Sequence, residues 1–211
     1  PSSLPANIVR AVLEDRDGKV WAGTHGGGLA DRKRAAEGKR VDLGGRRDTE
    51  NNTHDDVRAL LLDGEGTLWV GTYGGGLDRF DRSRGAFVHV AASEGGAGAL
   101  LVDALLEDRS GTVWAGTYGG GLFAVDRGSG RLVRCRGEAL PSALVKALAE
   151  DHEGFLWVAT DGGGLARLDR RTGAVVVHRH DPAEPRSLAT DRVWALREVR
   201  CLDSSDVLRH R

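Results

Sequence analysis

The stretch LWVGTYGGGLDRFD, from Leu68 to Asp81, decides the fold, because close copies of it begin at Val20, Val113 and Leu156. The copies align on four tryptophans: Trp21, Trp69, Trp114 and Trp157. Successive tryptophans lie 48, 45 and 43 residues apart, which is the period expected of β-propeller blades. The chain is therefore a repeat protein, and one repeat explains most of it.

Each repeat contains four short strand-like pieces separated by turn signals. In the second copy they are VRALLLD, TLWVGT, GLDRF and AFVHV, at residues 57–63, 67–72, 76–80 and 86–90. The first turn, DGEG, opens with Asp63, which can accept hydrogen bonds from the following amides, and ends with Gly66, which supplies a positive φ. The same aspartate recurs as Asp15, Asp108 and Asp151. Each repeat is thus predicted to be a four-stranded antiparallel sheet.

A single sheet of this kind cannot bury both of its faces, so neighbouring sheets must stack on one another. The radial arrangement of such sheets is a β-propeller, and we predict an all-β fold. The four repeated tryptophans are assigned to packing between blades, where one buried indole contributes on the order of 4–6 kcal/mol as an upper bound. Repetition in every copy favours this structural role over contact with a ligand.

The repeat is incomplete towards the C-terminal end. A fifth copy begins properly over residues 193–196, but Val199, Leu202 and Ser205 stand where the pattern next requires an aspartate, a glycine and a tryptophan. We expect complete blades at about residues 8–50, 56–92, 101–137 and 144–180, the first strand of a fifth blade at 192–198 and a non-repeat tail at 199–211. The chain is therefore predicted to be an arc of a larger propeller. Its open ends would expose strand edges and an apolar blade face, which favours self-association, for instance as a homodimer.

The glycine triplet after each repeated threonine has two interpretations, a phosphate-binding loop or a connection between strands. A phosphate cradle needs glycines that open a helix, followed in a P-loop by Lys and then Ser or Thr. Here Leu and then a strand follow every triplet, at residues 26–28, 74–76, 119–121 and 162–164. We therefore interpret the triplet as a strand connection at which side chains would collide with the adjoining blade. No cofactor is expected.

Composition argues against several classes of function. Lys and Arg number 30 against 31 Asp and Glu, so the formal net charge of -1 gives no global case for binding nucleic acid or an anionic membrane. No apolar run is long enough to span a membrane. The two cysteines, Cys135 and Cys201, have neither a metal-ligand spacing nor a disulfide pattern. Because the chain contains no Met, we expect a processed product or an excised fragment, and the missing signal peptide then says little about the compartment.

The repeat consensus V-x-A-[VL]-x-x-D-x-x-G-x-[VL]-W-[VA]-[GA]-T-x-G-G-G-L-x-x-x-D resembles the two-component regulator propeller repeat. The spacer HRHDPAEPRSLATDRVWAL, from His178 to Leu196, is similar to that family's connection between blades, and the resemblance extends from Ile8 to about Glu198. It implies a periplasmic or extracellular sensor segment of a bacterial signalling protein, with a downstream histidine kinase or diguanylate cyclase. Propellers of the family are larger, usually seven-bladed, and the cue of well-understood members is a carbohydrate breakdown product.

The free position of the second turn, T-x-G-G-G, is the candidate ligand-binding position. It carries His25, Tyr73, Tyr118 and Asp161. Second turns and the linkers between blades lie on one face of a propeller, opposite the first and third turns, and both vary here. A uniform scaffold with dissimilar polar and aromatic tips is typical of a recognition surface, with solvated loop tips as the alternative. Because tyrosine rings can stack on sugars and His or Asp can bind hydroxyls, the expected ligand is a small molecule or an oligosaccharide.

No catalytic or metal-binding residue is predicted. His178 and His180 would face one side of a strand, but no third ligand follows at metal spacing. The turn aspartates are similar to those in hairpins of sialidase-like propellers, yet four equivalent carboxylates do not give the two unlike environments that separate an acid from a base. We interpret the chain as a non-catalytic sensor segment whose partners are its ligand, the rest of the propeller and a downstream signalling domain. A protein–protein interaction scaffold and a propeller lyase or hydrolase are the alternatives.

Overall fold

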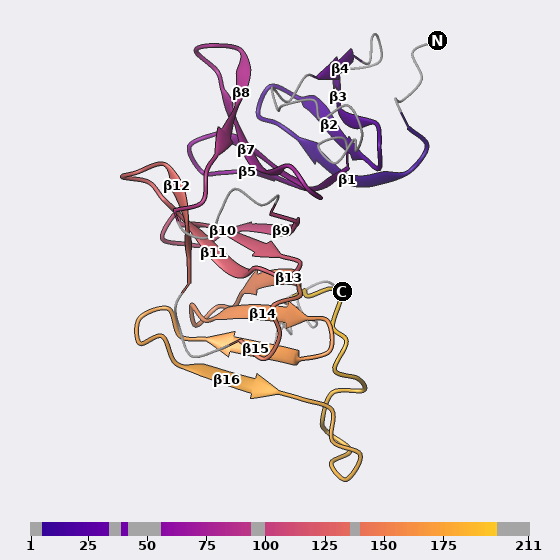
Figure 1. Cartoon of the computed structure of the whole chain (residues 1–211), viewed down its shortest axis with the longest axis vertical. Helices are drawn as coiled ribbons and strands as arrows, with labels where there is room; N and C mark the ends of the chain where they lie inside the picture. The colour runs from indigo at the N-terminus through magenta and orange to yellow at the C-terminus, as the bar shows by residue number, and fades with distance from the viewer. Residues whose placement is uncertain (1–5, 34–38, 42–55, 94–99, 136–139, 198–211) are drawn as a thin grey trace, which may run out of the picture.

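The computed structural model describes residues 6–33, 39–41, 56–93, 100–135 and 140–197. These residues form sixteen β-strands and no helix, so none of them provides a helix that could cross a membrane. The strands make four separate four-stranded antiparallel sheets that follow one another along the molecule (Figure 1). Each sheet is a meander in chain order and contains one repeat. The predicted all-β propeller arc with four four-stranded blades is confirmed.

We number the blades 1 to 4 from the N-terminal end. Blade 1 contains β1 (Val9–Glu14), β2 (Lys19–Thr24), β3 (Gly28–Lys33) and β4 (Lys39–Val41). Blade 2 contains β5 (Val57–Leu62), β6 (Leu68–Thr72), β7 (Gly76–Asp81) and β8 (Ala86–Val90). Blade 3 contains β9 (Val102–Glu107), β10 (Val113–Thr117), β11 (Gly121–Asp126) and β12 (Arg131–Arg134). Blade 4 contains β13 (Val145–Glu150), β14 (Leu156–Thr160), β15 (Gly164–Leu168) and β16 (Val175–His178).

The blades converge at their first strands, since β1 packs against β5, β5 against β9 and β9 against β13. Every first strand also carries a register shift opposite the end of the second strand. In blade 2, Val57 pairs with Thr72 and Ala59 with Gly71, so Arg58 bulges out of the ladder. A bulge re-aims a side chain, which frees this position from the apolar packing of the strand.

Three apolar clusters fill the seams between neighbouring blades. Trp21, Trp69 and Trp114 each belong to one of them and are 4%, 7% and 8% exposed. In the seam between blades 1 and 2, for example, the indole of Trp21 shares its cluster with Val57 and Leu68 of blade 2. These three indoles therefore lie between blades, whereas Trp157 lies on the outer side of blade 4 and belongs to none of the three clusters.

Close approach across each seam depends on a glycine in the second strand. A Cβ atom at Gly71 would lie 2.6 Å from Cγ1 of Val102 in blade 3. The other two seams repeat this contact at 2.5 Å, between Gly23 and Val57 and between Gly116 and Val145. Because interiors are close-packed, any side chain at these glycines would force the blades apart.

The fifth repeat departs from the expectation, because residues 193–197 form no strand. Arg192 makes an isolated antiparallel bridge with Asp161, and the N–H of Val193 donates to the carbonyl oxygen of Thr160 at 3.0 Å. A first strand pairs along its length with the second strand of its own blade, and the described residues hold no such partner for this one. The segment is therefore held only at its start. The predicted tail at 199–211 lies outside the described residues.

Candidate ligand-binding site

The second turn has the same construction in every blade, set by its threonine and glycines. In blade 2 the buried hydroxyl of Thr72 donates to the carbonyl oxygen of Gly76 at 3.2 Å. Gly74 and Gly76 have φ values of 114° and 78°, which residues with a side chain rarely adopt. The triplet is thus a tight strand-to-strand turn, and no helix follows it.

The middle glycine of the triplet is required for a different reason. A Cβ atom at Gly120 would lie 2.6 Å from Oγ1 of Thr117 and 3.1 Å from the ring of Phe123. Both obstacles at Gly120 belong to the same blade, whereas Cβ atoms at Gly27 and Gly163 would also lie 2.8 Å from Ala6 and from Pro141, in the segments that lead into their blades. The expected collision with a strand of the adjoining blade is not found at these positions. That collision occurs instead at the glycine of the second strand, such as Gly71.

The residue after each threonine forms the tip of the turn and contacts the start of the next repeat. Nδ1 of His25 lies 3.0 Å from Oδ2 of Asp56. At the other end of the arc, Oδ1 of Asp161 lies 3.6 Å from Nε of Arg192. The two tips between them make backbone bridges, Tyr73 with Leu101 and Tyr118 with Leu144. The four predicted residues therefore form a row over successive blades, with polar pairs at its ends and two tyrosines in the middle.

The two tyrosines of this tip row lie side by side on neighbouring blades. Their ring centroids are 6.3 Å apart and their planes are tilted by 56°. A cation covers one face of each ring, since the guanidinium carbon of Arg58 is 4.5 Å from the centroid of Tyr73 and Nζ of Lys146 is 4.5 Å from that of Tyr118. Cations are attracted to ring faces at such distances. Tyr118 remains 37% exposed, so the pair is accessible to a ligand.

Two buried carboxylates hold these cations. Oδ2 of Asp56 lies 2.9 Å from Nη2 of Arg58, and Oδ2 of Asp103 lies 2.6 Å from Nζ of Lys146. The side chains of Asp56 and Asp103 are 9% and 7% exposed, and Oδ1 of each is buried without a hydrogen-bond partner. An unsatisfied buried acceptor is costly until a donor meets it. The row thus has unused capacity for hydrogen-bond donors.

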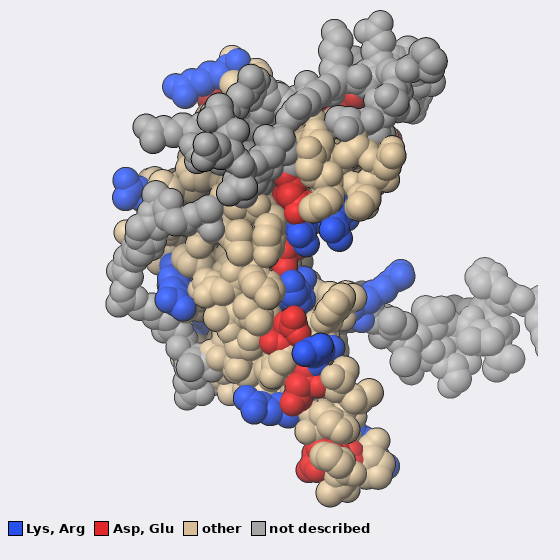
Figure 2. All heavy atoms as spheres, turned by 45° about the vertical axis from the view of Figure 1, so that its right-hand side comes forward, with Lys and Arg blue, Asp and Glu red and all other residues tan. Residues whose placement is uncertain are grey.

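The sequence predicts the tips but does not predict the charged groups beside them. The bulged position, x in V-x-A-[VL], is Arg58, Asp103 and Lys146 in blades 2 to 4 and Trp194 in the fifth copy. The variation at this position was the available signal. Figure 2 brings the right-hand side of Figure 1 forward and shows acidic and basic side chains alternating in a column down the molecule.

On the opposite face, the first-turn aspartate holds both the turn and the tryptophan. Oδ1 of Asp108 accepts from the backbone N–H groups of Ser110 and Thr112, and Oδ2 accepts from Nε1 of Trp114 at 2.7 Å. Burial alone would raise the pKa of Asp108, but hydrogen bonds from Ser110, Trp114, Thr112 and Arg170 outweigh it and lower the pKa below its usual value. The other three blades repeat the bond to the indole, through Asp15, Asp63 and Asp151. These carboxylates therefore have a structural role, because they hold the first turn and the indole of each blade.

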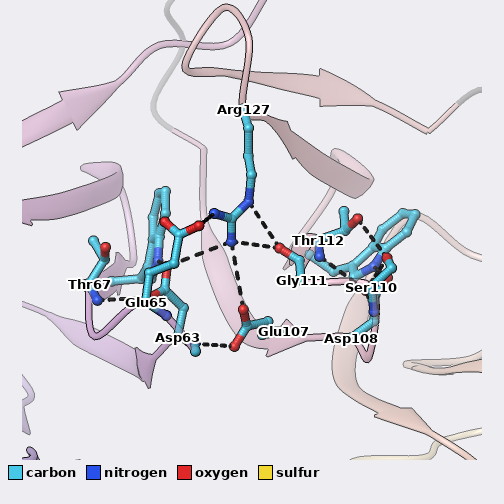
Figure 3. A network of polar contacts seen from close by, with 12 residues as sticks. Asp63, Glu65, Thr67, Glu107, Asp108, Ser110, Gly111, Thr112 and Arg127 are labelled. Atoms are coloured by element: carbon cyan, nitrogen blue, oxygen red, sulfur yellow. Dashed lines mark hydrogen bonds and ion pairs between the residues drawn. The ribbon is translucent and has the colours of Figure 1, made fainter.

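Arginines at the start of the third turn join the blades on this face. Figure 3 shows Arg127 of blade 3, whose Nη2 donates to the carbonyl oxygen of Gly111 at 2.7 Å. The same guanidinium lies 2.5 Å from Oε1 of Glu65 in blade 2 and 3.6 Å from Oε1 of Glu107 in its own blade. One side chain thus ties two blades together.

Arg170 repeats this arrangement one blade later. It donates to the carbonyl oxygen of Gly154 at 3.0 Å and forms an ion pair with Asp108 across the seam. Sequence analysis also missed these clamps. The signal was the dipeptide Asp-Arg at the start of every third turn, which places an arginine at Arg32, Arg82, Arg127 and Arg170.

The two histidines near β16 do not share a face. His178 stacks on Trp157 with ring centroids 5.4 Å apart, whereas His180 lies beyond the strand and its Nδ1 is 2.6 Å from the carbonyl oxygen of Leu188. Within the described residues, no three or more His, Cys, Asp or Glu side chains are grouped to hold a metal ion.

Two cavities lie away from the tip row. The larger, about 820 Å³, opens on the first-turn face between blades 3 and 4, where Asp108, Trp114 and Arg170 contribute to its lining. The smaller, about 260 Å³, lies on the outer side of blade 4 against Trp157. Neither of the two is lined by the tips.

Three segments of the chain match the family model described as two component regulator propeller, at residues 3–26, 53–74 and 139–162. They include the tips of blades 1, 2 and 4. A comparison with curated proteins finds no match.

Solved structures of two extracellular domains from B. thetaiotaomicron are similar to this chain. One, described as belonging to a one-component system, is 27% identical with a TM-score of 0.74 over 92% of this chain and 25% of its own. The other, from a hybrid two-component system, is 29% identical with a TM-score of 0.68 over 82% of this chain and 22% of its own. The chain thus spans about a quarter of these two structures.

A virginiamycin B lyase from Staphylococcus aureus, solved with quinupristin, also matches. It is 14% identical, with a TM-score of 0.61 over 80% of this chain and 54% of its own. This similarity shows the propeller fold alone.

Proposed function

Because the chain carries repeats of the two-component regulator propeller family, we propose that it is a non-catalytic, ligand-binding segment of the extracytoplasmic sensor of a bacterial signalling protein. The similar extracellular domains of one-component and hybrid two-component systems support both the sensory role and the location. The rest of the propeller and a downstream signalling domain are its expected partners.

The observation that carries this proposal is the tip row. Four turns of identical construction present different side chains at one position, His25, Tyr73, Tyr118 and Asp161. A scaffold that needed only to fold would not require this variation, whereas recognition needs unlike groups at fixed places. The exposed part of the tyrosine pair gives the row an aromatic centre.

The chemistry of the row favours a ligand rich in hydroxyl groups. Oδ1 of Asp56 has no hydrogen-bond partner, and Oδ1 of Asp103 has only Nη1 of Arg58 nearby, at 3.9 Å, which is beyond hydrogen-bond distance. Hydroxyl groups are suitable donors for both oxygens. The cations beside these carboxylates are already paired, so the row does not attract a strongly charged ligand. The ring of Tyr73 or Tyr118 can stack on a sugar through the face that its cation leaves free. A carbohydrate is therefore the proposed ligand class.

Binding at the row would change how neighbouring blades pack. The tip of one blade contacts the start of the next repeat, as His25 contacts Asp56 and Asp161 contacts Arg192. A ligand that prefers one arrangement of these contacts shifts the protein towards it. We propose that this shift biases the geometry of the downstream signalling domain.

The experiment is a calorimetric titration of the purified chain with neutral oligosaccharides and uronic acids. The double variant Tyr73→Ala/Tyr118→Ala should lose at least about tenfold in affinity, because it removes the aromatic centre. Tyr73→Phe/Tyr118→Phe should keep most of it, since the rings remain. Val177→Ala, at an exposed valine on β16, is the control for loss of surface side chains. Unchanged affinity in the double alanine variant would place the site elsewhere.

A protein-interaction scaffold is the second candidate, and the exposed apolar side of blade 1 favours it. Ile8 and Val12 are 53% and 67% exposed. If no carbohydrate raises the unfolding midpoint while light scattering shows a defined assembly, this second function replaces the first. A lyase or hydrolase has less support, because the repeated turn aspartates are all bound to their turns and indoles.

A further inference from the structure

The outer side of blade 4, which faces the fifth repeat, is built differently from the outer sides of blades 1 to 3. On the first strand, the residue paired with the tryptophan is Leu13, Leu61 or Leu106 in blades 1 to 3. Each of these leucines packs into a seam cluster. In blade 4 the residue paired with Trp157 is Ala149. The exchange removes three carbon atoms from this side of the blade.

The second difference lies two residues after the tryptophan. Blades 1 to 3 have a glycine there, against which the valine of the next first strand packs. Blade 4 has Ala159, and Val193 is the valine of the fifth copy. A Cβ atom at the equivalent glycines would lie within 2.6 Å of that valine's Cγ1. Ala159 therefore places a methyl group where the closed seams have no side chain.

The third difference concerns the side chains that lie against the indole of the tryptophan. The imidazole of His178 stacks on Trp157 at 5.4 Å, and the guanidinium carbon of Arg167 lies 6.0 Å from the indole centroid. Both groups come from blade 4 itself. The indoles of blades 1 to 3 pack against apolar residues of the next blade, and for Trp21 this holds although Nζ of Lys19 in its own strand lies 4.0 Å from the ring. The distinguishing feature of Trp157 is therefore the stacked imidazole.

These differences leave a cavity of about 260 Å³ between blade 4 and the start of the fifth repeat. Ala149, Trp157 and Leu165 line it from blade 4, and Leu196 lines it from the fifth repeat. We propose that this cavity is a second binding site, separate from the tip row, for a small ligand with one apolar ring and one negative group.

The volume of the cavity and the residues that line it indicate what kind of ring the ligand should have. An apolar cavity of about 150 Å³ is enough for benzene, so about 260 Å³ accommodates a single ring with a short substituent. Ala149, Leu165 and Leu196 supply apolar walls, and the indole of Trp157 offers an aromatic surface for offset or edge-on contact. A polar ring such as a sugar would leave its hydroxyls without partners here.

The charged residues that line the cavity indicate which charge its ligand should carry. Glu150 and Asp151 also line the cavity, but Glu150 already pairs with Arg170 at 2.5 Å, and Oδ2 of Asp151 accepts from Trp157 Nε1 at 2.6 Å. The remaining charged group is Arg197, which is exposed and has no ion pair with any described residue. Arginine binds carboxylates in a planar, two-pronged geometry. A carboxylate one or two bonds from the ring therefore fits.

The test is a titration of the purified chain with phenylacetate, followed by NMR chemical shifts. 2-Phenylethanol tests the ring without the charge, and acetate tests the charge without the ring. Ala149→Leu restores the leucine of the other blades and fills the cavity. Ala86→Leu makes the same exchange at an exposed alanine of β8 and is the matched control.

We expect saturable binding of phenylacetate, at least tenfold weaker binding of 2-phenylethanol and no saturable binding of acetate. Ala149→Leu should weaken phenylacetate binding at least tenfold without loss of thermal stability, and Ala86→Leu should leave it unchanged. Arg197→Gln should bring the affinities of phenylacetate and 2-phenylethanol together. The absence of saturable phenylacetate binding, or binding that survives Ala149→Leu, would overturn the proposal. Tyr73→Ala/Tyr118→Ala should not affect this titration, which separates the cavity from the tip row.

Discussion

The seam between blades 3 and 4 and the outer side of blade 4 start from the same repeat but end in different environments. In the seam, Trp114 is 8% exposed, and its partner Asp108 pairs with Arg170 of the next blade. On the outer side, Trp157 makes the same bond to Asp151, yet it borders a cavity and stacks on a histidine of its own blade. The hydrogen bond between tryptophan and aspartate thus forms within one blade, whereas burial of the indole requires two neighbouring blades.

Replacing the two indoles tests this comparison most strongly. Trp114→Ala is expected to cost about 3–5 kcal/mol of unfolding free energy, because the closed seam cannot refill the space. Trp157→Ala should cost clearly less, because its indole is only partly buried and already borders a cavity. Urea unfolding of both variants measures the difference. Equal losses would mean that the outer side of blade 4 is as closed as the seam.

Exchanging glycine and alanine in the second strand sharpens the comparison. Gly116→Ala places a Cβ atom 2.5 Å from Cγ1 of Val145 and should cost about 1–3 kcal/mol through overpacking. Ala159→Gly should lower the unfolding free energy by less than about 1 kcal/mol, which is the usual effect of the greater backbone freedom of glycine in a strand. The same urea experiment reports both values. A neutral Gly116→Ala would show that the seam can widen freely.

The decrease of the unfolding free energy at acidic pH gives the smallest expected effect. Burial alone would raise the pKa of Asp108 and of Asp151, but hydrogen bonds to each carboxylate outweigh it, so both pKa values lie below 3.8 in the folded protein. Their stabilisation is therefore complete above pH 3.8 and is lost as the pH falls through the folded pKa. Asp108→Asn should cost about 1–2 kcal/mol at neutral pH, because Arg170 loses its charged partner across the seam.

Unfolding free energies at about pH 7 and about pH 3 check this prediction. The loss caused by Asp108→Asn should shrink at the lower pH, because the unfolded wild-type chain takes up a proton at Asp108 more readily than the folded protein does. Asp151→Asn, which breaks no ion pair between blades, should cost less at pH 7. A loss from Asp108→Asn that does not change with pH would contradict the assigned protonation.

Most of the fold could be predicted because its signals are local. The strand-like segment around Trp69, the Asp-to-Gly first turn and the T-x-G-G-G second turn fix strands and turns within a few residues of each other. The tips, such as Tyr73, could be found because they interrupt an otherwise constant motif. The sequence also marks the positions of Arg58 and Arg127, but not their contacts, since the first acts through a strand bulge and the second through its reach across a seam.

The sequence by itself determined four four-stranded sheets, their order and the position of each tip, because hydrogen bonding within a meander needs only its own repeat. The tertiary structure alone decided that Ala149 opens a cavity where Leu106 fills a seam, that Arg170 reaches Asp108, and that residues 193–197 form no strand. The physical reason is that these outcomes depend on the neighbouring blade. Close packing and ion pairing between repeats involve residues that are distant in sequence, and no single copy of the repeat contains both partners.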